Sequence, residues 1–123
     1  MRGLQWTPGK NFDSTGGFGP WLVASKDLPP GGRGLRLTTR LNGQVMQSAS
    51  TEDMIFDLSE QIRVISQIMT LLPGDLIVTG TPGGVGYGRD PKIFMRPGDE
   101  CEVEIEGIGL LRNPVQAQSP DGE

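Results

Sequence analysis

The 123-residue sequence contains no histidine and only one cysteine, Cys101. Without histidine the chain lacks the usual general base, the Ser–His and Cys–His nucleophile pairs and the most common zinc ligand. A lone cysteine cannot form an internal disulfide, which fits a reducing compartment. These absences exclude the common hydrolase dyads and triads and predict a cytoplasmic protein.

The sequence also lacks long apolar runs and basic clusters. No run approaches the roughly 20 residues that cross a bilayer, and no apolar stretch follows the first charged residue as a signal peptide requires. The 11 Lys and Arg against 15 Asp and Glu give a net charge of −4. Because nucleic acids and anionic lipid surfaces are bound through basic patches, neither is an expected partner.

Glycine and proline are abundant, with 19 and 10 residues. They stand between clear apolar runs, so they indicate turns in a β-rich fold rather than disorder. Period-two alternation predicts a strand over 35–41, joined through Asn42-Gly43 to a second strand over 44–47. Both turn residues tolerate positive φ, as a tight hairpin requires. Further strands are expected over 21–23, 76–78, 101–106 and 110–112, and the strand over 76–78 is expected to be buried.

One amphipathic helix is predicted from Leu58 to Leu72. Asp57 can cap its first turn, with Glu60 as the second half of a capping box, and Pro73-Gly74 ends it. Apolar residues at 4-3-4-3 spacing line one face, which we expect to lie across the sheet as core. These residues are Leu58, Ile62, Ile65, Met69 and Leu72.

Together these elements predict an α+β, mainly β fold. The expected architecture is a sheet paired over long range and closed over the single amphipathic helix. We expect one domain over residues 1–115, followed by a polar tail over 116–123.

A glycine-rich loop over residues 78–86 follows the predicted strand 76–78. Its glycines let backbone N–H groups approach an anion closely, and Thr79 and Thr81 add hydroxyl donors. Composition alone favours a plain turn. Joined with the ammonium of Lys10, however, the loop would suit a substrate that carries a carboxylate and a carbonyl developing enolate charge.

Two other patterns have ordinary structural interpretations. Glu102 and Glu104 lie on one face of a predicted strand, as a hard-cation site requires, but alternating glutamates also mark a solvated strand face, and this interpretation is favoured. The glycines at 84, 86 and 88 are not a dinucleotide fingerprint, because Pro91 and turn residues follow in place of a helix.

Eight short motifs occur in order between about Trp6 and Val115, and together they resemble the C-terminal catalytic domain of the fumarylacetoacetate hydrolase family. Each motif is weak alone, whereas their order is specific. The motifs are Lys10-Asn11-Phe12-Asp13, Gly19-Pro20-Trp21, Leu41-Asn42-Gly43, Asp53-Met54-Ile55-Phe56, Pro73-Gly74-Asp75, Thr79-Gly80-Thr81-Pro82-Gly83-Gly84-Val85-Gly86, Pro97-Gly98-Asp99 and Glu104-Ile105-Glu106-Gly107-Ile108-Gly109.

The resemblance implies a mixed β-roll or sandwich-like sheet packed around the helix, here as an incomplete family domain. It also implies a chain that is usually homodimeric, with a Mg²⁺ or Mn²⁺ cofactor. It implies C–C bond hydrolysis, decarboxylation or isomerisation of small 2-oxo or 2,4-dioxo acids, as in aromatic catabolism. In the mechanism that the resemblance implies, the substrate carboxylate and the adjacent keto oxygen bind the metal, which stabilises the enolate.

Carried over by motif, Lys10 resembles the family's catalytic lysine near the metal. Ser14 stands where some members place a threonine beside the metal, and Gly80 and Thr81 resemble the group that holds the substrate carboxylate. The metal-ligand carboxylates are expected upstream of Met1, so no metal ligand is assigned in this chain. The alternative is a non-catalytic remnant, or a carboxylate-binding β-rich module, that dimerises.

Overall fold

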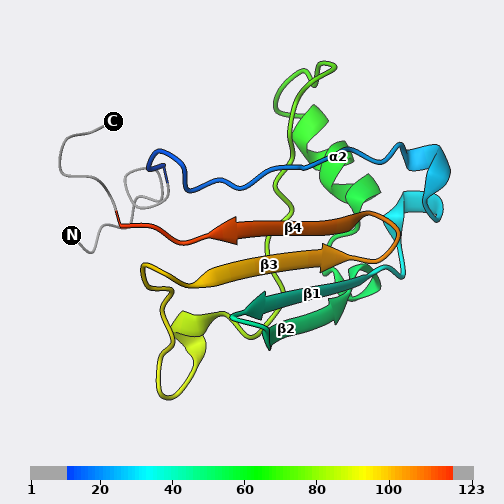
Figure 1. Ribbon diagram of the computed structural model, residues 1–123. Coiled ribbons are helices and arrows are strands. Elements are labelled where there is room, and N and C mark those ends of the chain that lie inside the picture. The colour runs from blue at the N-terminus through cyan, green and yellow to red at the C-terminus, as the bar shows by residue number, and fades with distance from the viewer. Residues whose placement is uncertain (1–10, 118–123) are drawn as a thin grey trace.

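The computed structural model describes residues 11–117. Its centre is a four-stranded antiparallel sheet in the order β2-β1-β3-β4 (Figure 1). The α+β, mainly β fold class is confirmed. The strands are β1 (Arg36–Leu41), β2 (Gln44–Ser50), β3 (Glu100–Ile105) and β4 (Gly109–Pro114), and the helix is α2 (Leu58–Ser66). Four 3-10 turns complete the described part: η1 (Ser25–Asp27), η2 (Pro30–Gly32), η3 (Thr51–Asp53) and η4 (Gly86–Gly88).

The predicted hairpin at Asn42-Gly43 is confirmed. Both residues adopt the left-handed conformation, with φ of 51° and 79°, which matches the twist of the strands they join. The Asn42 side chain donates to Asp99 Oδ1 (2.8 Å) and accepts from the Glu100 N–H (2.9 Å). The hairpin is thereby fixed to the start of β3. The bond from Asn42, and then the one from the Arg96 N–H, hold the pKa of the Asp99 carboxyl below its usual value.

The two Pro-Gly-Asp sequences form the same turn. In each, the glycine takes a positive φ, 101° at Gly74 and 93° at Gly98. The aspartate then accepts from the N–H three residues earlier, from Leu72 to Asp75 Oδ2 and from Arg96 to Asp99 Oδ2, both 2.7 Å. Proline fixes the second position and glycine supplies the third, so the sequence determines the turn locally.

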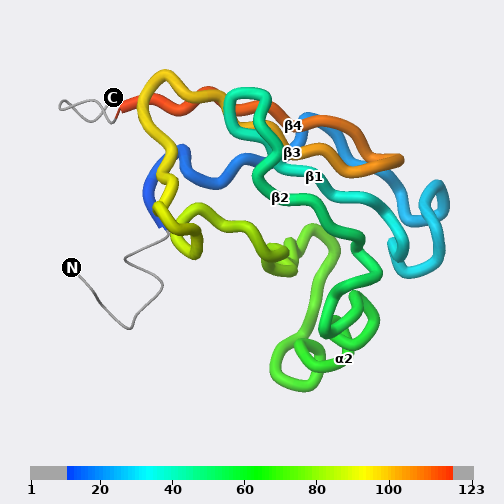
Figure 2. Tube along the Cα trace, turned by 90° about the horizontal axis from the view of Figure 1, so that it is seen from below, coloured from blue at the N-terminus to red at the C-terminus, as the bar shows by residue number. Residues whose placement is uncertain are grey.

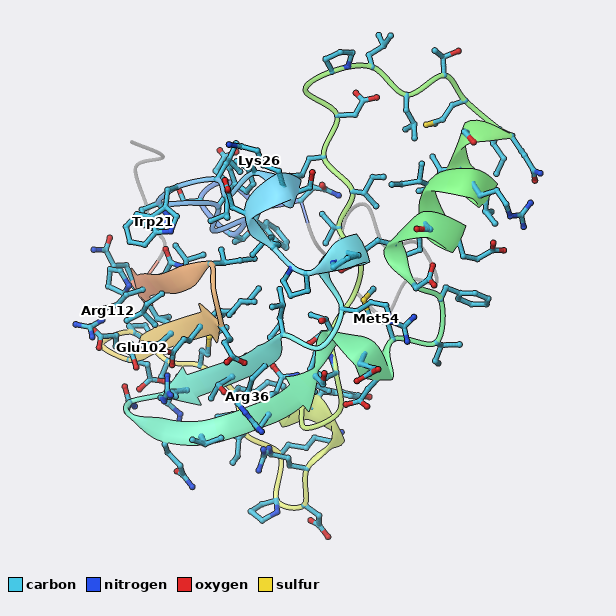
Figure 3. All side chains as sticks on the ribbon, turned by 90° about the vertical axis from the view of Figure 1, so that its right-hand side faces the viewer. Trp21, Lys26, Arg36, Met54, Glu102 and Arg112 are labelled. Atoms are coloured by element: carbon cyan, nitrogen blue, oxygen red, sulfur yellow. The ribbon has the colours of Figure 1, made fainter. Side chains whose placement is uncertain are left out.

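The two faces of the sheet differ as the alternation in β3 predicts. Cys101, Val103 and Ile105 lie on one face, and the glutamates lie on the other. The second face is more than a solvated acidic surface, because arginines neutralise it: Arg40 Nη1 lies 2.8 Å from Glu104 Oε2, and Arg112 Nη2 lies 2.6 Å from Glu102 Oε1. Glu102 is only 9% exposed, and Figure 3 shows it beside Arg112.

Two predicted strands are wrong. Residues 21–23 and 76–78 have no place in the sheet. The indole of Trp21 donates instead to the Ile108 carbonyl (2.5 Å). The 76–78 segment was expected to be buried, yet Val78 is 85% exposed. An extended apolar run becomes a strand only when a neighbouring backbone pairs with it.

Helix α2 starts as predicted and ends early. Asp57 Oδ1 accepts from the Glu60 N–H (2.9 Å), but the Glu60 side chain pairs with Arg63 instead of closing a capping box. The helix ends at Ser66 rather than Leu72. Figure 2 shows α2 projecting away from the sheet instead of lying across it. The expected core residues Met69 and Leu72 are 59% and 64% exposed. Helical turns with nothing apolar to pack against are weakly stabilised.

The described part of the chain has a small hydrophobic core. Leu35 is the one apolar residue classed as buried there, and no described side chain is fully buried. Figures 1 and 2 show that the segments around α2 extend well beyond the sheet.

The close approach of the segment after η4 to Gly86 gives a testable prediction. A Cβ at Gly86 would overlap the Ile93 carbonyl, whereas a Cβ at Gly83 would meet nothing within 4 Å. We therefore expect Gly86→Ala to lower the free energy of unfolding in urea by about 1–3 kcal/mol, as overpacking does. The matched Gly83→Ala should change it little. Equal effects of the two substitutions would contradict the described path of residues 86–93.

Candidate functional site

A cavity of about 740 Å³ opens between the β1–β2 hairpin and the segments that follow it. Leu37 and Ala49 of the hairpin form its floor, and Thr79, Gly80 and Thr81 form one wall. The cavity is therefore built by residues that are far apart in sequence. The glycine-rich loop lies at its rim.

Another part of the cavity lining is apolar. Met54, Ile55 and Phe56 form it, and Figure 3 shows Met54 between α2 and the sheet. Two polar residues there are held locally: Asp53 Oδ2 accepts from the Ser50 N–H (3.0 Å), and Gln61 donates to the Phe56 carbonyl (2.7 Å). This combination of an apolar wall and a wall of hydroxyls and bare backbone is typical of a small-molecule site.

The loop wall is held in place by Gln47 of β2. Its Nε2 lies 2.9 Å from Thr81 Oγ1, 2.8 Å from the Pro82 carbonyl and 3.5 Å from the Gly83 carbonyl. These contacts connect a strand residue to three consecutive residues of the loop. The loop is thus fixed to the sheet although its preceding segment is not part of a strand.

A β-bulge makes a second connection possible. Thr39 pairs with Gln47 while Arg40 pairs with Val45, so Met46 is the extra residue in β2. Its carbonyl accepts a hydrogen bond from Arg89 Nη2, and Arg89 Nε donates to the Gly84 carbonyl at 3.0 Å. Gly84 has a φ of 100°, and a Cβ there would lie 2.6 Å from the Met46 oxygen. Only glycine permits this approach.

The structure places the predicted site residues as follows. Gly80 and Thr81 lie together on the cavity wall. Ser14 is exposed, with a φ of 56°, and it is not among the cavity-lining residues. Lys10 lies outside the described residues. The roles assigned to these residues by resemblance therefore stay predictions.

Gln47 and Arg89 were missed by the sequence analysis. Gln47 falls in the predicted strand over 44–47, and no predicted element includes Arg89. The signal that could have found them is weak, because a bulge has no reliable signature in a run such as Val45-Met46-Gln47.

The described residues do not fit a divalent metal ion. Within residues 11–117, no group of three or more His, Cys, Asp or Glu side chains could hold one. Glu102 and Glu104 are engaged with Arg112 and Arg40, and the expectation of a solvated face is wrong for Glu102, which is buried. Cys101 is free, and burial, followed by the charge of Glu102, raises the pKa of its thiol. No described helix has the length and apolar character to cross a membrane.

Comparison with known families identifies the fold. The fumarylacetoacetate hydrolase C-terminal family model matches residues 1–116. The chain belongs to this family. Oxaloacetate tautomerase FAHD2A, mitochondrial, of Bos taurus is 47% identical over 113 residues, covering 92% of this chain and 36% of the relative. The 2,4-didehydro-3-deoxy-L-rhamnonate hydrolase of a Sphingomonas species is 41% identical, covering 94% of this chain and 40% of the relative.

Solved structures of family members show the same architecture. A fumarylacetoacetate hydrolase from psychrophilic Exiguobacterium antarcticum matches with a TM-score of 0.85 at 41% identity, covering 90% of this chain and 39% of that protein. A maleylpyruvate hydrolase from Sphingobium sp. SYK-6, in complex with manganese(II) and pyruvate, matches with a TM-score of 0.70 at 33% identity, covering 81% and 35%. The chain thus spans well under half the length of these relatives.

The Arg89 contacts give a prediction about loop rigidity. Charge-assisted hydrogen bonds contribute about 1.5–3 kcal/mol each, so Arg89→Leu should release the loop at Gly84. We expect ¹⁵N relaxation order parameters of residues 80–84 to fall from about 0.85 to below about 0.6. Those of β3 and β4 should not change.

Arg96→Leu, on the turn before β3, is the matched control and should leave the loop unaffected. Unchanged order parameters in Arg89→Leu would show that Arg89 does not hold the loop.

Proposed function

We propose that the chain is part of an enzyme that acts on small 2-oxo or 2,4-dioxo acids and that it supplies the wall binding the substrate carboxylate. The named relatives include a tautomerase and hydrolases of this kind of acid. The single observation that supports the assignment is the position of Thr81 and Gly80 on the cavity wall. Hydrolysis, decarboxylation and isomerisation are all compatible with such a wall.

The proposed binding mode follows from the chemistry of the two walls. A carboxylate oxygen would accept hydrogen bonds from the Thr81 hydroxyl and from loop N–H groups. The carbon chain of the acid would contact Met54, Ile55 and Phe56.

Other parts of the proposal rest on the resemblance. Lys10 as catalytic residue and Ser14 as metal-adjacent residue are proposed on motif position alone. A Mg²⁺ or Mn²⁺ cofactor is a family property, seen with manganese in the maleylpyruvate hydrolase, and the described residues contribute no ligand set to it. A cytoplasmic location is proposed from the single cysteine, although the bovine relative is named as mitochondrial.

Pyruvate is a suitable probe of the proposed site, because it is a small 2-oxo acid. We expect a ¹H–¹⁵N titration with pyruvate to shift the amide signals of residues 79–83. Thr81→Val removes the hydroxyl at nearly constant shape and should weaken binding about tenfold, since a hydrogen bond to a charged group contributes about 1.5–3 kcal/mol.

Thr81→Ser keeps the hydroxyl and serves as the control. Shifts confined to other parts of the chain, or equal affinities of Thr81→Val and Thr81→Ser, would overturn the proposal.

We also propose that the chain forms a homodimer through the apolar segment Ile68–Val78. Ile68, Leu72, Leu76 and Val78 are between 64% and 85% exposed. Stable dimers bury about 800 Å² on each partner. A second copy that covers this segment would supply the missing apolar contacts. The same observation supports the alternative of a non-catalytic, dimerising module.

Sedimentation equilibrium tests the dimer. We expect about twice the 13.2 kDa chain mass, and we expect Ile68→Glu to shift the equilibrium toward monomer, because burying a carboxylate in an apolar interface is costly. Lys26→Glu, an equally exposed change on η1, should have no effect. A monomer at all concentrations would contradict the proposed dimer.

A further inference from the structure

We infer that Gln47 is a positioning residue, which holds the hydroxyl of Thr81 as a hydrogen-bond donor toward a carboxylate in the cavity. The inference rests on the proposed function and deepens it. Neither the family match nor the named relatives assign a role to this side chain. Four observations support the inference: the chemistry of the Gln47 contacts, the exposure of Thr81, the position of Thr81 on the cavity wall, and the bulge beneath Gln47.

The orientation of the Gln47 amide is fixed by its partners. The Pro82 carbonyl, at 2.8 Å, can only accept a hydrogen bond, so the group facing it is the NH₂ and not the amide oxygen. The NH₂ has two N–H bonds. One is used by Pro82, and the other is available to Thr81 Oγ1 at 2.9 Å.

The Thr81 hydroxyl must therefore accept from Gln47. A hydroxyl has one proton and two lone pairs, and accepting from Gln47 uses a lone pair while leaving the proton for another partner. Thr81 is exposed and lines the cavity, so a ligand oxygen can take that proton. A carboxylate has acceptors only, and this arrangement favours it over a ligand group that could donate.

Gln47 is well placed to fix the direction in which the Thr81 hydroxyl donates, because Gln47 belongs to the sheet. It follows the bulged residue Met46, which is itself held through its carbonyl by Arg89. Gln47 is half-buried, and its backbone pairs with Thr39 in the hairpin. A side chain on a paired strand loses little further freedom when it orients a loop hydroxyl.

The inference is tested by a double-mutant cycle that uses pyruvate as the probe. Gln47→Met keeps the length of the side chain and removes the donor, so the Thr81 proton is no longer directed. We expect about a threefold loss of pyruvate affinity, the size of one net neutral hydrogen bond. Gln47→Glu reverses the direction of the hydrogen bond, since its carboxylate accepts the Thr81 proton. This substitution should lower pyruvate affinity at least tenfold.

The cycle is completed in the Thr81→Val background, where there is no hydroxyl to direct. There Gln47→Met should cause a clearly smaller loss of affinity, limited to the loss of its contacts with the Pro82 and Gly83 carbonyls. A positioning role requires this coupling. If Gln47 only supported the loop, Gln47→Met would weaken binding by the same factor in both backgrounds, and the inference would be wrong.

A ligand-free measurement separates this inference from the proposed function. Thr81→Val should move one of the two Gln47 side-chain N–H signals in a ¹H–¹⁵N spectrum, and Thr81→Ser should leave both in place. Unmoved signals in Thr81→Val would overturn the inference whether or not pyruvate binds. Signals that move as expected, in a chain that does not bind pyruvate, would support the donor arrangement and count against the proposed function.

Discussion

One extra residue in β2 determines how the chain presents its cavity. Because Met46 is left out of the ladder, its carbonyl is free to accept from Arg89, and Gln47 reaches the loop that carries Thr81. The segment leading into that loop is exposed and pairs with no strand of the described sheet. Without the two connections at the bulge, the glycine-rich loop would have little to hold it against the sheet. The proposed carboxylate site therefore depends on the bulge.

The parts of the fold that the sequence predicts are those set by neighbouring residues. Asn42-Gly43 fixes the hairpin, Asp57 caps α2, and the two Pro-Gly-Asp turns form from their own side chains. The failures concern long-range partners. Residues 76–78 have the composition of a strand, but composition does not show whether another backbone lies beside them. Thr81 could be found from motif order, whereas Gln47 could not, since its function depends on a register shift with no local signature.

The molecule divides into a well-connected sheet and a poorly covered apolar region. On the sheet, arginines from β1 and β4 pair with the glutamates of β3, so the buried carboxylate of Glu102 has a charged partner. Around α2 and residues 68–78, apolar side chains face outward. Family relatives are more than twice as long as the matched region. The sheet and its bulge are sufficient to place the loop. The exposed apolar region is the reason for proposing that a second copy of the chain covers it.

The most direct test is a crystal structure of the chain with pyruvate bound. A pyruvate carboxylate oxygen should lie within about 3 Å of Thr81 Oγ1, as a hydrogen bond requires. Gln47 Nε2 should still contact Thr81 Oγ1 from the side of the sheet. A pyruvate bound away from the cavity, or a Thr81 hydroxyl that donates to a reoriented Gln47 amide oxygen, would contradict the proposed role of the bulge and the loop it holds.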